Sequence, residues 1–269
     1  MYRLLAIDLD GTLLTPPPRK HITPRTFKAL HQAADAGMII VIATGQTLSV
    51  LQHVCAELPL EAPQIIENGA VIADVHSGTI FHERLMPPDL ILPALAALRR
   101  LSLHRAYHTL HRVYVDNDTP RARNWYRPPV PPVIEVEDVA DLFPLSCIKV
   151  AGIGEESTLR EKRRELERIF DGKLHVTQSS FDIVELLHPE VSKGNALSMI
   201  AADLAIKPEE IVAFGDNHND IGMLRLAGLG VAMGNAHEEV KAAADYVTLS
   251  NAQDGVAVVI EELILPAFK

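Results

Sequence analysis

The sequence predicts an α/β protein: a Rossmann-like, doubly wound parallel sheet that is interrupted by an inserted α+β domain. Two observations support this. Short apolar runs alternate with helical segments toward both ends of the chain, which is the pattern of βαβ units. The sequence pattern changes in the middle of the chain, where proline pairs, short strands and a charged helix replace that alternation.

The first part of the chain is predicted to run strand, helix, strand, helix, strand. The first two strands are the short uninterrupted apolar runs 4–7 and 38–43, which are typical of strands buried on both faces, and the third is expected over 64–66. Thr23 and Pro24 predict the start of a helix that Gly37 ends, and a second helix is expected over about 48–58. A glycine-containing hairpin is predicted over 71–81.

We expect residues 85–189 to form the inserted domain, and residues 1–84 and 190–269 to form the core. The insert is predicted to contain helices over 90–101 and 155–170. Its strands are expected near 112–115 and over 147–152, 174–177 and 181–187, with a tight serine turn between the last two. The core resumes with a helix over 192–204 and strands over 210–214, 229–233 and 246–248.

Composition excludes several classes of protein. A formal net charge of -10 over 269 residues argues against a nucleic-acid partner, which needs positive charge to neutralise phosphates. No apolar run approaches the ~20 residues that cross a bilayer, and no secretory signal is visible at the first residues. Cys55 and Cys147 are too few for a disulfide framework, so a reducing cytoplasm is expected. Monomer and homodimer both remain open.

Two aspartates stand where the first apolar run stops, and Gly11 turns the chain after them. If the strand pitch continues, Asp8 and Asp10 project to the same side. Paired carboxylates either hold a hard cation or divide the roles of nucleophile and general acid/base. An ordinary turn at the end of a strand is the alternative. Ligands bind at the carboxyl ends of strands in open α/β sheets, which favours chemistry here.

Three further polar groups follow the acid pair along the chain. They add a hydroxyl with a free backbone N–H, an ammonium, an amide and two more carboxylates: Thr44-Gly45, Lys193, and Asp216 with Asn219-Asp220. Each alone is more simply a surface or turn residue. Together they suit phosphoryl transfer to water, because a cation on carboxylates, a lysine and a hydroxyl neutralise the spreading charge of a phosphoryl group.

The order of these groups resembles the haloacid dehalogenase superfamily over essentially the whole chain. Its four motifs are matched by Asp8-Leu9-Asp10-Gly11-Thr12, Thr44, Lys193 and Gly215-Asp216-Asn217-His218-Asn219-Asp220. The insert lies between the second and third motifs, as in members with the large α+β (C2-type) cap. Three further segments resemble the Cof-type phosphatase branch, subclass IIB: 67–70, 191–194 and 232–236.

The resemblance implies a Mg²⁺-dependent phosphatase that acts on a small phosphorylated metabolite, a sugar phosphate or a phosphorylated cofactor. Asp8 would attack phosphorus, and Asp10 would serve as general acid and then general base. The implied metal ligands are the Asp8 and Asp216 carboxylates and the backbone carbonyl of Asp10. Phosphoryl oxygens would be held by Leu9, Thr44, Gly45, Lys193 and Asn219, with Asp220 orienting Lys193 or a metal-bound water.

One residue departs from the branch. Arginine usually follows its Thr-Gly pair, and this chain has Gln46. Any contact that the arginine makes with substrate is therefore in doubt, whereas the chemistry at Asp8 is not.

Alternatives remain at the level of sequence. The chain could be a phosphosugar phosphatase of narrow specificity, a phosphomutase with the same aspartyl chemistry, or a phosphometabolite-binding protein without catalysis. The second domain also contains a group of basic residues: His104, His108 and His111, with Arg105 and Arg112 beside them. A solvated face is the first interpretation of this group, a surface toward anionic substrate is the second, and a metal site is the least favoured. The run 127–132 is interpreted as a stiff connection in preference to a polyproline ligand. The helix over 155–170 is interpreted as a solvated one.

Overall fold

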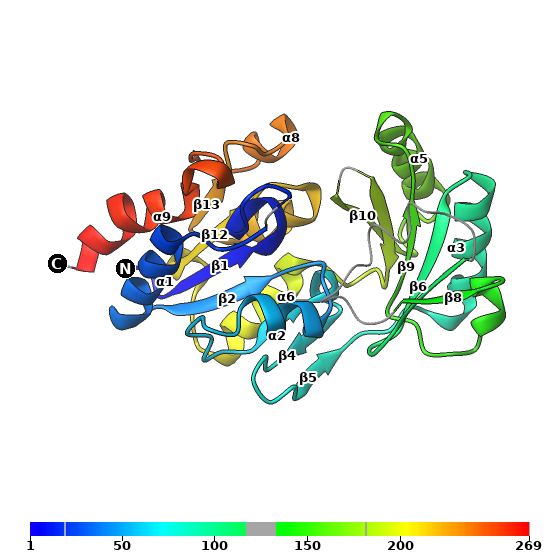
Figure 1. Cartoon of the computed structure of the whole chain (residues 1–269), viewed down its shortest axis with the longest axis horizontal. Helices are drawn as coiled ribbons and strands as arrows, with labels where there is room; N and C mark the ends of the chain where they lie inside the picture. Colours follow the sequence, from blue (N-terminus) through cyan, green and yellow to red (C-terminus); the bar gives the residue numbers. More distant parts are fainter. Residues whose placement is uncertain (19, 117–132, 181, 269) are drawn as a thin grey trace. The chain divides into compact units, whose positions relative to one another are not determined.

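The computed structural model describes residues 1–18, 20–116, 133–180 and 182–268, and these residues form two compact units. The first unit comprises Met1–His82 and Ser192–Lys269, and the second comprises Glu83–Val191 (Figure 1). The predicted boundaries, 84/85 and 189/190, lie next to these divisions. The run 127–132, expected to be a stiff connection, lies outside the described residues.

The first unit is built on an eight-stranded sheet in the order β14-β13-β12-β1-β2-β3-β4-β5. β14, β13, β12, β1, β2 and β3 run parallel, and β4 pairs antiparallel with β3. The strands are β1 (Leu4–Asp8), β2 (Ile39–Ala43), β3 (Gln64–Ile66), β4 (Val71–Ala73), β5 (Ile80–Glu83), β12 (Ile211–Gly215), β13 (Leu229–Ala232) and β14 (Tyr246–Val247). The predicted α/β class is confirmed.

β1 lies at the centre of this sheet, between β2 and β12. Its register places Asp8 opposite Ala43 and Ile7 opposite Phe214, so the three strands end at nearly the same level. All five residues of β1 are buried, which explains why its sequence is an unbroken apolar run rather than an alternating one. The register therefore brings the residues that follow β1, β2 and β12 to one edge.

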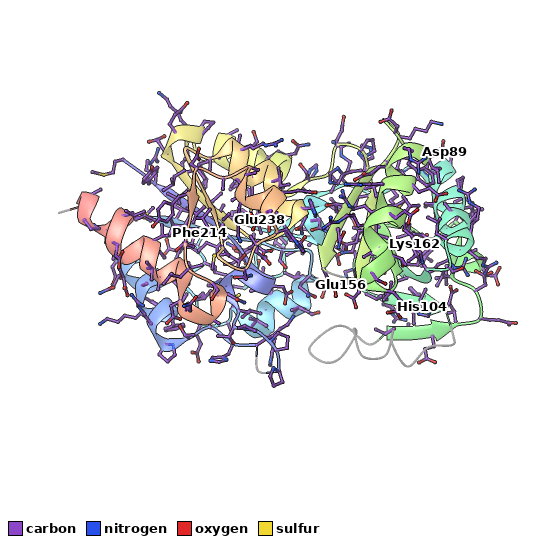
Figure 2. All side chains as sticks on the ribbon, turned by 90° about the horizontal axis from the view of Figure 1, so that it is seen from above. Asp89, His104, Glu156, Lys162, Phe214 and Glu238 are labelled. Atoms are coloured by element: carbon purple, nitrogen blue, oxygen red, sulfur yellow. The ribbon has the colours of Figure 1, made fainter. Side chains whose placement is uncertain are left out.

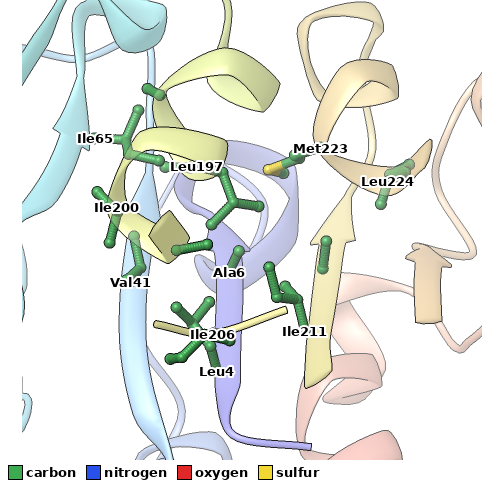
Figure 3. Packing of buried hydrophobic residues seen from close by; sticks show 14 of the residues in the cluster. Leu4, Ala6, Val41, Ile65, Leu197, Ile200, Ile206, Ile211, Met223 and Leu224 are labelled. Carbon is green, nitrogen blue, oxygen red and sulfur yellow. The ribbon is translucent and has the colours of Figure 1, made fainter. Parts of the chain in front are cut away.

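Helices cover both faces of the sheet. α1 and α9 contact each other and the β1–β2 side, whereas α6 and α7 pack together on the opposite face. That second face holds an apolar cluster in which Leu4, Leu197 and Met223 come from β1, α6 and α7 (Figure 3). The helices are α1 (Pro24–Asp35), α2 (Leu48–Val54), α6 (Lys193–Asp203), α7 (Ile221–Leu226), α8 (Glu238–Lys241) and α9 (Gly255–Val259).

The boundary of α1 follows its predicted capping residues. The Thr23 side chain accepts a hydrogen bond from the N–H of Thr26, Pro24 occupies the first helical position, and Gly37 beyond the end has a φ of 89°. The expectation for α2 was too long, because the helix ends at Val54 and residues 55–58 form turns.

Gln64 closes a gap between β2 and β3, which share a single register pair, Ala43 with Ile65. Its side chain is fully buried and replaces the missing backbone pairs. Oε1 accepts from the N–H of Ile42 at 2.6 Å, and Nε2 donates to the carbonyl of Ala62 at 2.6 Å. One amide side chain thus satisfies two buried backbone groups.

The second unit is a six-stranded sheet in the order β10-β11-β9-β6-β7-β8, antiparallel except for β7 with β8. α3 and α5 pack on one face around an apolar cluster that includes Leu98, Tyr107 and Leu166. Its elements are α3 (Pro88–Arg100), β6 (His104–His108), β7 (Val113–Asp116), β8 (Val133–Val136), β9 (Lys149–Ile153), α5 (Glu156–Ile169), β10 (His175–Ser180) and β11 (Ile183–Leu187).

α5 has the polar surface that its sequence predicts. Only Leu159 and Leu166 of this helix are buried, and Glu156 and Lys162 are labelled on it in Figure 2. Figure 2 also places Phe214 of β12 in the first unit, where its side chain is fully buried. The serine turn was placed wrongly, because Ser179 and Ser180 belong to strand β10.

The histidine segment is only in part the solvated face that we expected: His111 and Arg112 are exposed, but the residues before them are not. His104 to His108 form β6, a central strand that the sequence pattern did not reveal, and His108 is buried. Arg105 is also buried and pairs with Asp116 at 2.6 Å and with Asp138 at 2.9 Å. These ion pairs give Arg105 a structural role, because a buried guanidinium must be paired.

No helix among the described residues is both apolar enough and long enough to span a membrane.

We predict that Gln64→Leu destabilises the protein. Leucine fills the space but leaves the Ile42 N–H and the Ala62 carbonyl buried without partners, a cost of about 2–4 kcal/mol. Urea unfolding measures the change. Gln52→Leu is the matched control, because Gln52 makes one part-buried bond to the Val75 carbonyl, and we expect it to cost less than about 1 kcal/mol. Equal effects of the two variants would contradict this role of Gln64.

Candidate active site

Asp8 is the last residue of β1 and is 5% exposed. The chain leaves the strand directly after it, since Leu9–Leu13 form one π-helical turn with non-helical angles at Asp10 and Gly11. Gly11 has a φ of 87°, a conformation that favours glycine. The strand pitch therefore stops before Asp10, so the premise that Asp8 and Asp10 share one side of a continued strand was wrong.

Lys193 joins two of the predicted acids. It is the first residue of α6, which Ser192 caps by accepting from the N–H of Asn195. Its Nζ lies 2.5 Å from Oδ1 of Asp8 and 2.6 Å from Oδ1 of Asp220, and its side chain is completely buried. A buried ammonium requires such partners because an isolated charge is costly to bury.

The loop after β12 holds the two other acids. Oδ2 of Asp220 accepts from the backbone N–H groups of Asp216 at 3.0 Å and Asn217 at 2.9 Å, so this side chain fixes the loop. Asp216 is held in turn by the hydroxyl of Thr12, which donates to Oδ1 at 3.2 Å. The loops after β1 and β12 are thereby tied together.

Three carboxylates crowd around one ammonium. Oxygens of Asp8, Asp216 and Asp220 all lie within 4.8 Å of one another, and Lys193 is the cation that contacts two of them. Burial and the Asp220 carboxylate raise the pKa of Asp8 well above its ordinary value, although Lys193 opposes this. Burial and Asp220 also raise the pKa of Asp216, to about 7. The excess of negative charge favours a bound cation.

The same charges act on Lys193 in the opposite sense. Burial by itself lowers the pKa of the ammonium, but the carboxylates of Asp220 and Asp8 outweigh that effect and raise it above its ordinary value. Lys193 therefore stays charged at neutral pH.

The donor set suits a hard divalent cation. Oδ2 of Asp8 is buried and makes no hydrogen bond to the described residues, so this oxygen is available to a ligand. Both oxygens of Asp220 are occupied, one by Lys193 and the other by backbone N–H groups, which suits a supporting role. Asp8 and Asp216 are thus the side chains best placed to bind a cation through oxygen.

The residues after β2 reach the site through Asn68. The backbone N–H of Asn68 donates to the Thr44 carbonyl at 2.9 Å, and its Oδ1 accepts from Nδ2 of Asn219 at 2.8 Å. Asn68 has a φ of 58°. A Cβ at Gly45 would lie 3.1 Å from Oδ1 of Asn68, which is a close contact. A glycine at position 45 leaves room for this bridge.

The structure thus brings together most of the predicted site. Contacts connect Asp8, Lys193 and Asp220; Thr12 connects Asp216 to them, and Asn68 connects Thr44 with Asn219. Leu9 is buried directly after Asp8. The roles of these residues, including the Leu9 and Gly45 N–H groups and the Asp10 carbonyl, stay predictions.

Sequence reasoning assigned no role to four residues that the structure places here. Asn68 and Asn235 lie in segments that resemble the phosphatase branch, which was the available signal. Nδ2 of Asn235 donates to the Gly11 carbonyl at 2.8 Å. Gln46 and Lys20 contact the Asp10 carboxylate, at 2.6 and 2.5 Å. No sequence signal pointed to Lys20, because its loop reads only as a proline-rich turn.

Comparison with known proteins agrees with this geometry. Residues 5–260 match the family model described as haloacid dehalogenase-like hydrolase. The chain is 33% identical over 275 residues to pyridoxal phosphate phosphatase YbhA of Escherichia coli, covering 95% of this chain and 96% of that protein. It is 31% identical over 265 residues to 5-amino-6-(5-phospho-D-ribitylamino)uracil phosphatase YcsE of Bacillus subtilis, covering 98% and 96%. A haloacid dehalogenase-like hydrolase structure from B. subtilis superposes with a TM-score of 0.85 at 28% identity, covering 97% and 99%.

We predict that Gly11→Ala weakens cation binding as well as stability. A Cβ at Gly11 would lie 2.3 Å from Oδ2 of Asp216 and displace that carboxylate. Gly37→Ala is the matched control, because Gly37 has nearly the same φ, 89°, but nothing lies within 4 Å of its Cβ position. Both should lose about 1–2 kcal/mol through the left-handed conformation.

Calorimetric titration with Mg²⁺ separates the two variants. Affinity should fall about tenfold or more in Gly11→Ala, as for loss of one carboxylate contact worth about 1.4 kcal/mol, and should not change in Gly37→Ala. Equal affinity in the two variants would contradict the placement of Asp216 as a ligand.

Proposed function

The chain belongs to the haloacid dehalogenase-like hydrolase family, and from that premise we propose that it is a Mg²⁺-dependent phosphatase. It would hydrolyse small phosphomonoesters through a phosphoaspartate on Asp8. The observation that carries this proposal is the state of the Asp8 carboxylate. Lys193 holds Oδ1 at 2.5 Å, while Oδ2 is buried and accepts no hydrogen bond from the part of the chain that the structure describes. A carboxylate that is fixed at one oxygen and otherwise unbonded keeps lone pairs both for a cation and for a bond to phosphorus.

In the first half-reaction Asp8 attacks the phosphorus atom. A bond forms between an Asp8 oxygen and phosphorus, and the bond from phosphorus to the ester oxygen breaks. Asp10 gives its proton to that leaving oxygen. Lys193 stays charged and contributes positive charge beside the transferred group.

In the second half-reaction water releases the phosphate. Asp10, now ionised, takes a proton from a water molecule whose oxygen attacks phosphorus. The bond between Asp8 and phosphorus breaks, and the Asp8 carboxylate is restored. The acid and base roles of Asp10 are the same group used in opposite directions.

The Asp8 and Asp216 carboxylates, with the Asp10 backbone carbonyl, would hold Mg²⁺. The ion supplies charge that offsets the three crowded carboxylates and the incoming phosphoryl oxygens. Thr44, Gly45 and Asn219, with the Leu9 N–H, would bind the phosphoryl oxygens. Asp220 would keep Lys193 in place, which its 2.6 Å contact supports.

The proposed substrates are small phosphorylated metabolites, with phosphorylated cofactors and sugar phosphates as the classes to test first. The family membership and the names of the two phosphatases at 33% and 31% identity support this choice. The second unit, Glu83–Val191, is proposed as the part that selects among substrates.

We predict that Asp8→Asn abolishes Mg²⁺-dependent phosphate release. The substitution keeps the shape of the side chain but removes the nucleophile and one charge from the cation site, so the rate should fall by at least about a thousandfold. Phosphate release from a panel that includes pyridoxal phosphate and several sugar phosphates measures this, with Mg²⁺ and with chelator. Asp35→Asn is the control, because Asp35 lies exposed on α1.

Two results would count against the proposal. Near-full activity of Asp8→Asn would exclude covalent catalysis at this residue, and full activity of the wild type in chelator would exclude a metal requirement. A folded wild type that binds Mg²⁺ but releases phosphate from no ester in the panel would favour the non-catalytic alternative.

A further inference from the structure

We infer that Gln46 and Lys20 form a clamp on the carboxylate of Asp10 and so position the general acid/base. This inference rests on the proposed function, in which Asp10 transfers the protons. Nε2 of Gln46 donates to Oδ2 of Asp10 at 2.6 Å, and Nζ of Lys20 contacts Oδ1 at 2.5 Å. The two donors thus bind different oxygens of one carboxylate.

A clamp is needed because the backbone does not fix this side chain. Asp10 lies in a kinked turn, between Leu9 and a glycine with a φ of 87°, and its side chain is 26% exposed. The terminal torsion of an aspartate is broad, so without partners the plane of the carboxylate rotates easily. Donors on both oxygens restrict that rotation in the ionised form, and so set the orientation from which Asp10 takes up and gives back its proton.

Gln46 is well placed to act as one side of the clamp. Its backbone N–H donates to the hydroxyl of Thr44 at 3.1 Å, and its carbonyl accepts from the N–H of Glu67 at 3.0 Å. Both backbone groups are therefore anchored beside the end of β2. The side chain extends from this anchored backbone to Asp10, where its amide donates a hydrogen bond without adding charge.

Lys20 is the other side of the clamp and comes from the loop between Leu14 and Thr23. The base of that loop is closed by contacts between Thr15 and His21: the Thr15 N–H donates to the His21 carbonyl at 3.0 Å, and the His21 N–H donates to the Thr15 hydroxyl at 3.2 Å. These bonds hold Lys20, the neighbour of His21, close to Asp10.

The clamp should matter most where the leaving group needs a proton. A 4-nitrophenyl ester leaves as a stable anion and gains little from a general acid, whereas an alkyl phosphate such as glycerol phosphate needs one. Loss of the clamp should therefore lower kcat/KM for the alkyl ester far more than for the aryl ester. A general structural defect would lower both equally.

The test compares Gln46→Leu and Lys20→Met with wild type on both esters, in the presence of Mg²⁺. We expect a loss of about tenfold or more on the alkyl phosphate and less than about threefold on the aryl phosphate, a part of the 10²–10⁴-fold that acid–base catalysis contributes. The loss should lie in kcat rather than KM. Lys20→Arg should recover most of the alkyl rate, because arginine keeps the charge and the donor.

Matched controls come from the exposed surface of α1. Lys28→Met and Gln32→Leu make the same chemical changes away from the site and should leave both rates unchanged. Equal losses of Gln46→Leu and Lys20→Met on the two esters, or no loss on either, would overturn the inference. Thermal unfolding of each variant shows that the compared proteins are folded.

A second measurement does not depend on turnover. A water-soluble carbodiimide joins an amine to a carboxylate in contact with it: the amide bond forms, and the carbodiimide takes up the elements of water and leaves as a urea. Mass spectrometry of the treated wild type should find Lys20 linked to Asp10, and Asp10→Asn should abolish the link. Absence of the link would overturn the clamp, whereas a linked wild type that hydrolyses neither ester would overturn only the proposed function.

Discussion

The contact of Lys193 with both Asp8 and Asp220 is the interaction on which the site depends. It joins three elements that are far apart in the chain: the end of β1, the start of α6 and the loop after β12. All three side chains are buried, so removing any one would leave an uncompensated charge in the interior. The same burial raises the pKa of Asp8 and Asp216, and this is why the cluster favours a cation that supplies the missing positive charge.

The parallel sheet makes this contact possible, and short polar bonds then complete it. β1, β2 and β12 are neighbours in register, so the loops that follow them emerge at one edge. Thr12 then ties Asp216 to the first loop, Asn68 ties the second loop to Asn219, and Asn235 holds the Gly11 carbonyl. Because these loops bind one another, the polar groups are fixed before any ligand arrives. Such preorganisation is what electrostatic catalysis requires.

The sequence was sufficient to predict the core and to name most of the residues that the structure brings together at the candidate site, because both depend on short stretches of neighbouring residues. Buried parallel strands are unbroken apolar runs, and Asp8, Thr44 and Asp216 follow such runs directly. Contacts between residues far apart in the chain could not be predicted from the sequence. β6 escaped prediction because only Ala106 and Tyr107 of its five residues are apolar, so it carries neither an apolar run nor a clean alternation. Its Arg105 is buried only through ion pairs with distant acids, Asp116 and Asp138. Lys20 and Gln46 were missed as partners of Asp10 for a similar reason: the contacts arise from loop closure, which leaves no periodic signal. The continued strand pitch at Asp10 failed because β1 ends at Asp8 and the turn Leu9–Leu13 begins directly after it.

In the proposed reaction the phosphoryl group passes through Asp8. The most direct measurement is to quench the wild-type enzyme during turnover of a phosphomonoester with Mg²⁺, reduce it with borohydride, and map the modified residue by mass spectrometry. An acyl phosphate is reduced to an alcohol, so homoserine is expected at position 8 and an unmodified aspartate at position 10. Homoserine at another acid, or an unmodified Asp8 in an enzyme caught with phosphate covalently bound, would contradict the proposed reaction.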